Sequence, residues 1–182
     1  MRMMLTGAGA VGECILKMLE KRDPKGEWLS YVLLADFDLK RADEVKSHLE
    51  QERKYREGTQ YETAQVDARD REALTALMRE HRIDFVMDAA SPFVSNFIFD
   101  AAFEAGADYA SMGTWSVPKD HPEFGKGFEG AYLEPMTKYN FDRHEAWKKK
   151  GQMACICLGI DPGVVNVFAK YAAEYLFDEL LE

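Results

Sequence analysis

Three glycines near the amino terminus have the spacing of a phosphate-binding turn. Gly7, Gly9 and Gly12 form a G-x-G-x-x-G directly behind a short apolar run. In such a turn the first glycine allows a tight bend, the second lets a pyrophosphate approach the backbone, and the third lets a helix pack closely. The helix that starts at Ala10 and Val11 would point free N–H groups at the phosphates. The motif predicts a dinucleotide site; the alternative is a purely structural glycine turn.

An acidic residue closes the next apolar run, where a dinucleotide's ribose would lie. Asp36 follows Gly12 by 24 residues, close to the ~20-residue offset of the ribose-binding acid. Its carboxylate could accept both ribose hydroxyls and would repel a 2′-phosphate, so it favours NAD over NADP. Phe37 is assigned to the same site. Lys40 and Arg41 follow and could pair with a 2′-phosphate, which keeps NADP open.

Two later strand ends are also expected to face the cofactor. A carboxylate after the third strand could bond the adenine amino group, or it could simply cap a turn. Small residues after the fourth strand would let the backbone reach the ribose and nicotinamide, and the Ser-Pro pair among them also suits a helix start. These predicted contacts are Asp67, Ala68, Ala89, Ala90, Ser91 and Pro92.

The sequence shows no catalytic constellation and no metal site. Cys155 and Cys157 are expected to share one face of a buried strand and to pack in the core, because no partners stand at ligand spacing. Residues 113–138 break the regular pattern, and a long irregular connection is often functional. His121 and Tyr132 are the first candidates there, but the catalytic residue stays unassigned.

Apolar patterning places these residues on alternating strands and helices. Strands are predicted over residues 1–6, 31–36, 61–66, 83–89, 108–111 and 153–159. Helices are predicted over residues 11–22, 71–82 and 92–105, with Asp70 and Ser91 as N-caps and Gly106 ending the last of them, and also over 40–53, 141–150 and from 164 onward. Alternation of this kind means an α/β protein with a Rossmann-type doubly wound parallel sheet. Residues 1–163 would form the nucleotide-binding domain.

Composition narrows the class of protein. The 182 residues carry a formal net charge of −9 and are 47% hydrophobic. The acidic balance argues against a nucleic-acid or membrane surface, and no apolar run approaches the length of a membrane span. The first strand begins at the first residue, so no signal peptide is expected, and three cysteines make no disulfide framework. We therefore expect a cytoplasmic protein that binds neither nucleic acid nor membrane.

Four segments, in this order, resemble the N-terminal half of the saccharopine dehydrogenase family. They are GAGAVG at 7–12, DAASPF at 88–93, AAFEAGADY at 101–109 and GIDPGVVN at 159–166. The turn of Asp161, Pro162 and Gly163 followed by Val-x-Asn is the most specific part. The family includes saccharopine reductases, lysine 6-dehydrogenase and carboxynorspermidine dehydrogenases, and the resemblance is strongest to the last two.

The resemblance implies hydride transfer between a nicotinamide cofactor and the C–N bond of an amino acid or opine-like secondary amine. It also implies that Asp161 and Gly163 approach the nicotinamide together with residues 89–92. Two positions depart from the family pattern. NADP-preferring members tend to carry a basic or hydroxyl residue where Asp36 stands, and a proline is common where Ser91 stands.

In this family a substrate-binding domain follows the segment that ends this chain. We therefore expect residues 164–182 to be a connecting helix toward a missing substrate domain. The isolated chain would bind cofactor but lack activity, while the full-length protein would be a homodimer acting on a small amino-acid substrate.

Two other functions remain open at this point. A methyltransferase that uses S-adenosylmethionine also has a glycine-rich first turn and an acid after its second strand. Against it, such turns usually carry an acid two residues before the first glycine, where this chain has Leu5. A non-catalytic nucleotide-sensing domain is the other alternative.

Overall fold

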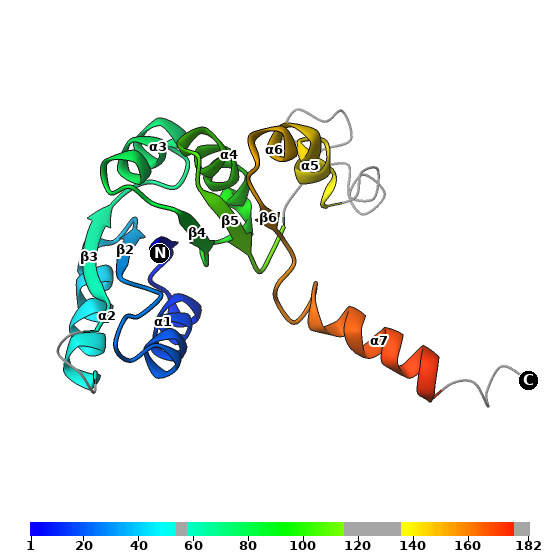
Figure 1. Ribbon diagram of the computed structural model, residues 1–182, viewed down its shortest axis with the longest axis horizontal. Coiled ribbons are helices and arrows are strands. Elements are labelled where there is room, and N and C mark those ends of the chain that lie inside the picture. Colours follow the sequence, from blue (N-terminus) through cyan, green and yellow to red (C-terminus); the bar gives the residue numbers. More distant parts are fainter. Residues whose placement is uncertain (54–57, 115–135, 177–182) are drawn as a thin grey trace, which may run out of the picture.

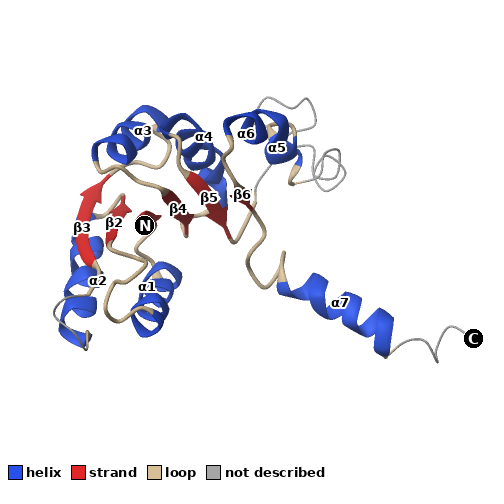
Figure 2. Ribbon diagram, viewed as in Figure 1, coloured by secondary structure: helices blue, strands red, loops and turns tan. Residues whose placement is uncertain are grey.

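The chain forms a parallel sheet of six strands with helices on both faces (Figures 1 and 2). The computed structural model describes residues 1–53, 58–114 and 136–176. The strands lie in the order β3-β2-β1-β4-β5-β6, so the chain reverses direction across the sheet between β1 and β4. The strands are β1 (Arg2–Thr6), β2 (Tyr31–Asp36), β3 (Gln60–Gln65), β4 (Phe85–Asp88), β5 (Asp108–Ser111) and β6 (Ala154–Cys155). This order confirms the predicted doubly wound fold.

The helices follow the strands in alternation. They are α1 (Ala10–Arg22), α2 (Leu39–Glu52), α3 (Arg71–Glu80), α4 (Ser95–Ala105), α5 (Lys138–Phe141), α6 (His144–Lys150) and α7 (Val164–Tyr175), with a 3-10 turn, η1, at Pro92–Val94. Among the described residues no helix is long and apolar enough to span a membrane.

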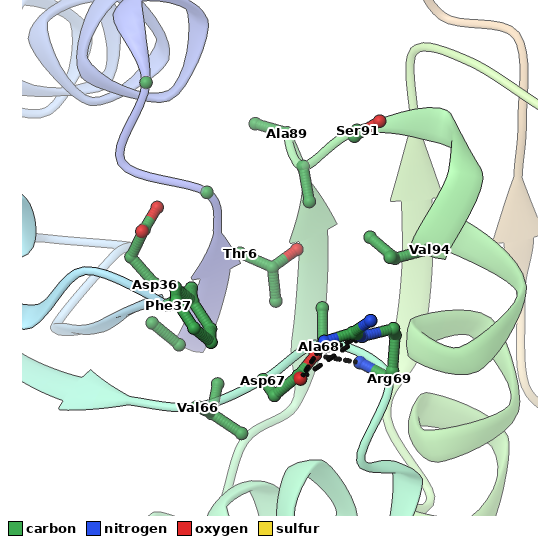
Figure 3. Close-up of a pocket in the computed structure, with 14 residues that line it drawn as sticks. Thr6, Asp36, Phe37, Val66, Asp67, Ala68, Arg69, Ala89, Ser91 and Val94 are labelled. Carbon is green, nitrogen blue, oxygen red and sulfur yellow. Dashed lines mark hydrogen bonds and ion pairs between the residues drawn. The ribbon is translucent and has the colours of Figure 1, made fainter.

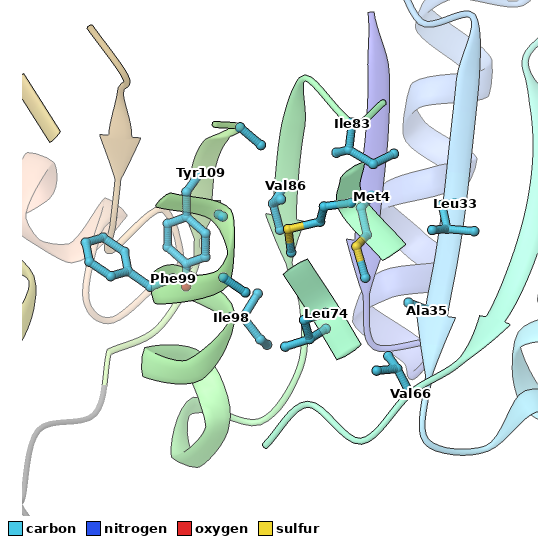
Figure 4. Packing of buried hydrophobic residues seen from close by; sticks show 14 of the residues in the cluster. Met4, Leu33, Ala35, Val66, Leu74, Ile83, Val86, Ile98, Phe99 and Tyr109 are labelled. Carbon is cyan, nitrogen blue, oxygen red and sulfur yellow. The ribbon is translucent and has the colours of Figure 1, made fainter. Parts of the chain in front are cut away.

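Each face of the sheet carries its own apolar core. Successive strand residues point to opposite faces, so Met4 and Leu33 pack toward α3 and α4, as Figure 4 shows. Their neighbours Leu5 and Leu34 join the second cluster, with Leu16 of α1. Burial on both faces explains why the sequence of β2 is a continuous apolar run.

Two of the three predicted helix caps are confirmed. The Asp70 carboxylate accepts the Ala73 N–H at 2.9 Å, and Gly106 ends α4 in the left-handed conformation with φ of 87°. Ser91 is different, because it makes no side-chain cap bond and is followed by a 3-10 turn before α4 begins at Ser95.

The predicted sixth strand is wrong in its extent. It covers only Ala154–Cys155, and Cys157 has a left-handed φ of 65°, which a continuing strand does not allow. Cys155 and Cys157 therefore do not share one face of a buried strand, and both are partly exposed. Residues 115–135, which include the candidates His121 and Tyr132, lie outside the described residues.

The last helix stands apart from the sheet (Figure 1). It begins at Val164, as predicted, and has no buried residue. Its apolar side chains are open to solvent, with Phe168 at 66% and Tyr175 at 68% exposure.

Candidate functional site

A cavity of about 450 Å³ opens where the carboxyl ends of β1, β2, β3 and β4 converge (Figure 3). It lies at the point where the strand order reverses, which is where open α/β sheets bind ligands. Its volume is in the range of small-molecule and cofactor sites. The described residues lining it are Thr6, Gly7, Gly9, Ala35, Asp36, Phe37, Val66, Asp67, Ala68, Arg69, Ala89, Ala90, Ser91 and Val94.

The three glycines of the turn have different roles. Gly7 has a φ of 94°, and a Cβ there would lie 2.7 Å from the Ala89 carbonyl oxygen. A Cβ on Gly12 would overlap the carbonyl oxygen of Gly7. Gly9 lines the cavity, and a Cβ on it would meet no atom of the described residues within 4 Å. Gly7 and Gly12 are therefore required by the fold, whereas the space beside Gly9 is open to a ligand.

Asp36 is held against the glycine turn. Its Oδ2 accepts the Ala8 N–H at 2.6 Å, and its Oδ1 accepts the Asp38 N–H at 2.8 Å. An ionised carboxylate has about four acceptor positions, so each oxygen can still accept a hydroxyl from the cavity. Phe37 follows with 69% of its surface exposed at the cavity wall. This geometry suits a ribose diol.

Arg41 and Lys40, the two basic residues that follow Asp36 in the sequence, differ in their contacts. The Arg41 Nε donates to the Ala8 carbonyl oxygen at 3.0 Å, and its guanidinium pairs with Glu13 of α1. The hydrogen bond from Arg41 lowers the pKa of Glu13 to about 2, helped by His48 and Lys17. The Lys40 side chain is 86% exposed, with its ammonium 3.9 Å from Glu44.

Asp67 and Arg69 form the wall opposite Phe37 (Figure 3). The Arg69 guanidinium binds both carboxylate oxygens, with Nη2 2.7 Å from Oδ2 and Nε 3.0 Å from Oδ1. The hydrogen bonds from Arg69 lower the pKa of Asp67 to about 2. The pair presents a planar, charge-neutralised surface on which a base can stack.

A buried carboxylate lies beneath the cavity. Asp88, 2% exposed, accepts hydrogen bonds from the Thr6 hydroxyl at 3.1 Å, the Tyr109 hydroxyl at 2.8 Å and the Ala90 N–H at 3.0 Å. Burial raises its pKa. The contacts tie β1, β4 and β5 to the loop that carries Ser91.

The predicted site residues fall into two groups. Nine of the fifteen are among the described cavity-lining residues given above. The other six do not line that cavity: Ala10, Val11 and Gly12 start α1, Pro92 starts η1, and Asp161 and Gly163 lie in the turn after β6.

Five cavity residues were not predicted: Thr6, Ala35, Val66, Arg69 and Val94. The position of Thr6 at the end of the first strand, directly before Gly7, was the clearest available signal. Within the described ranges, no three potential ligand residues cluster to hold a metal ion.

The sheet order, the glycine turn and the acid at the end of β2 define a dinucleotide-binding Rossmann domain. Comparison with known families is more specific. The chain belongs to the family described as the saccharopine dehydrogenase NADP-binding domain, whose model matches residues 3–155. The resemblance seen in the sequence is thereby confirmed, and NAD(P) is the cofactor class of the domain.

The curated relatives are longer proteins. The chain is 30% identical over 182 residues to carboxynorspermidine synthase of Vibrio cholerae, covering 99% of this chain and 41% of that protein. It is 26% identical over 179 residues to carboxyaminopropylagmatine dehydrogenase of Synechocystis, covering 98% of this chain and 39% of that protein.

Solved structures support the fold. Apo saccharopine dehydrogenase (L-Glu forming) from Saccharomyces cerevisiae matches with a TM-score of 0.63 at 17% identity, covering 95% of this chain and 31% of that one. An NAD-binding oxidoreductase from Klebsiella pneumoniae matches with a TM-score of 0.54 at 15% identity, covering 86% of this chain and 34% of that one.

Proposed function

We propose that this chain is the cofactor-binding part of an oxidoreductase that acts on the C–N bond of an amino acid or opine-like secondary amine, with NAD preferred over NADP. The observation that carries the cofactor preference is the Asp36 carboxylate, fixed by the Ala8 N–H beside the glycine turn. The reaction class is supported by the family and by the names of the curated relatives.

Different residues of the cavity would contact different parts of the cofactor. The backbone beside Gly9 and the start of α1 would hold the pyrophosphate, because the first N–H groups of a helix favour anions. Asp36 would accept the ribose hydroxyls. The adenine would lie between Phe37 and the Asp67–Arg69 pair. When bound, the nicotinamide supplies the hydride acceptor or donor.

The nicotinamide end would point toward the loop after β4. Ala89, Ala90 and Ser91 line that part of the cavity and present small side chains and backbone. The charged side chains among the described lining residues are Asp36, Asp67 and Arg69, all already engaged in hydrogen bonds. The general acid–base group that C–N chemistry requires would therefore come from elsewhere in the protein.

A substrate domain beyond this chain would supply that group and bind the small amino-acid substrate. The chain spans about 40% of the length of the curated relatives it matches. The exposed apolar side chains of α7, including Phe168 and Tyr175, support a connecting role for residues 164–182. We further propose that the full-length protein is a homodimer.

The test is a calorimetric titration of the 182-residue chain with NADH, NADPH and S-adenosylmethionine. We expect NADH to bind most tightly and S-adenosylmethionine not to bind. Binding of S-adenosylmethionine alone would instead indicate a methyltransferase. Turnover of an amine substrate by the full-length protein, and none by this chain, would separate an enzyme from a nucleotide sensor.

A further inference from the structure

One carboxylate beside the glycine turn contacts three basic side chains. Glu13, in the first turn of α1, pairs with the Arg41 guanidinium, and its Oε1 lies 3.2 Å from both Lys17 Nζ and His48 Nδ1. Its side chain is only 17% exposed. Glu13 does not line the described cavity, so cofactor contact does not account for this arrangement.

Arg41, one of the three basic residues that Glu13 contacts, also contacts the residue that holds Asp36. Asp36 and Arg41 bind the same residue, since the Ala8 N–H donates to Asp36 and the Ala8 carbonyl accepts from Arg41 Nε at 3.0 Å. A guanidinium at this point is a strong partner for a phosphate on the 2′-oxygen, because its fork of donors matches phosphate oxygens. Here, however, Nη2 faces Glu13, and Nη1 lies 3.7 Å from Glu44.

We propose that Glu13 is a specificity-determining residue for the cofactor. It holds the Arg41 guanidinium away from a 2′-phosphate, so that Glu13 and Asp36 both favour NAD. This inference rests on the proposed function, because it assumes that the ribose binds at Asp36. It adds to the usual explanation, in which the acid at the end of β2 sets the preference alone.

The test compares the dissociation constants of NADH and NADPH for wild type and Glu13→Gln. The variant releases Arg41, so NADPH should bind about tenfold more tightly while NADH changes by less than about twofold. Both nucleotides are measured on the same preparation, so any unfolded fraction cancels in the ratio. The matched control is Glu52→Gln, which removes a carboxylate 3.2 Å from Lys17 but leaves the Glu13–Arg41 pair intact. For this control, the ratio of the NADH and NADPH dissociation constants should equal that of wild type.

A double variant tests whether Arg41 is responsible for the gain in NADPH affinity. Adding Arg41→Ala to Glu13→Gln should abolish the gain in NADPH affinity. The inference is overturned if the ratio is unchanged in Glu13→Gln, or if the gain persists without Arg41. Either result leaves the proposed function intact as long as wild type binds NADH. If wild type binds neither nucleotide, both the proposed function and this inference are wrong.

Discussion

The three glycines of the turn have different structural roles. Gly7 and Gly12 are required because the backbone of β4 and of the turn itself occupies the space a side chain would need. Gly9 has open space beside it, in the cavity. The sequence spacing predicted this division of roles. Arg69 was missed because its importance arises from pairing with Asp67, and a basic residue in a polar loop gives no such signal by itself.

The cofactor preference should depend on Asp36. Asp36→Ala removes the ribose acceptor and the charge that repels a 2′-phosphate, so it should weaken NADH binding about tenfold and narrow the gap between NADH and NADPH. Asp36→Asn should relieve the repulsion while keeping one acceptor, and so lose less NADH affinity. Fluorescence titration of both nucleotides measures the effect. A wild-type chain that binds NADPH as tightly as NADH would show that Lys40 and Arg41 dominate.

At the scale of elements, the ion pair between Glu13 and Arg41 links α1 to α2 and should make stability depend on pH. The hydrogen bond from Arg41 lowers the pKa of Glu13 from 4.5 to about 2, so the folded state favours the ionised form. Its stabilisation is fully present above pH 4.5 and is lost as the pH falls toward 2.

Urea unfolding of wild type and Glu13→Gln should show this difference. Their gap in free energy of unfolding should be constant above about pH 5 and shrink as the pH falls below 4.5. Glu52→Gln, at a side chain 61% exposed, should stay close to wild type throughout. A gap between wild type and Glu13→Gln that does not change with pH would contradict the assignment.

The contacts of Asp88 link three strands beneath the cavity. Tyr109→Phe removes a hydroxyl that donates to this buried carboxylate at 2.8 Å, so it should lower the free energy of unfolding by about 1–3 kcal/mol. The control is Tyr139→Phe, whose hydroxyl donates to Asp100 at 2.6 Å. Asp100 keeps an ion pair with Arg143 and is 20% exposed, so the control should lose less. If chemical denaturation shows that both variants lose the same free energy of unfolding, the burial of Asp88 is not the cause of the loss in Tyr109→Phe.

For the whole molecule, the fold could be predicted because β1 and β2 are apolar runs and because helices such as α3 carry an apolar face. The run at 153–159 was misleading, because apolar patterning does not reveal the left-handed φ of Cys157 that interrupts the extended chain. The resemblance placed Asp161 and Gly163 near the nicotinamide, but in the structure they lie after β6 and do not line the described cavity. The cavity thus brings together Gly7 and Gly9, Asp36 and the loop after β4, whereas the turn after β6 lies outside it.

The central claim is that a nicotinamide dinucleotide binds this chain at the glycine turn, and Gly9→Val tests it most directly. A branched side chain there would fill space that no atom of the described residues occupies, so the fold should survive while calorimetric binding of NADH is lost. Ala173→Val, on the exposed surface of α7, is the matched control and should bind as wild type does. NADH binding by a folded Gly9→Val chain with unchanged affinity would contradict the account.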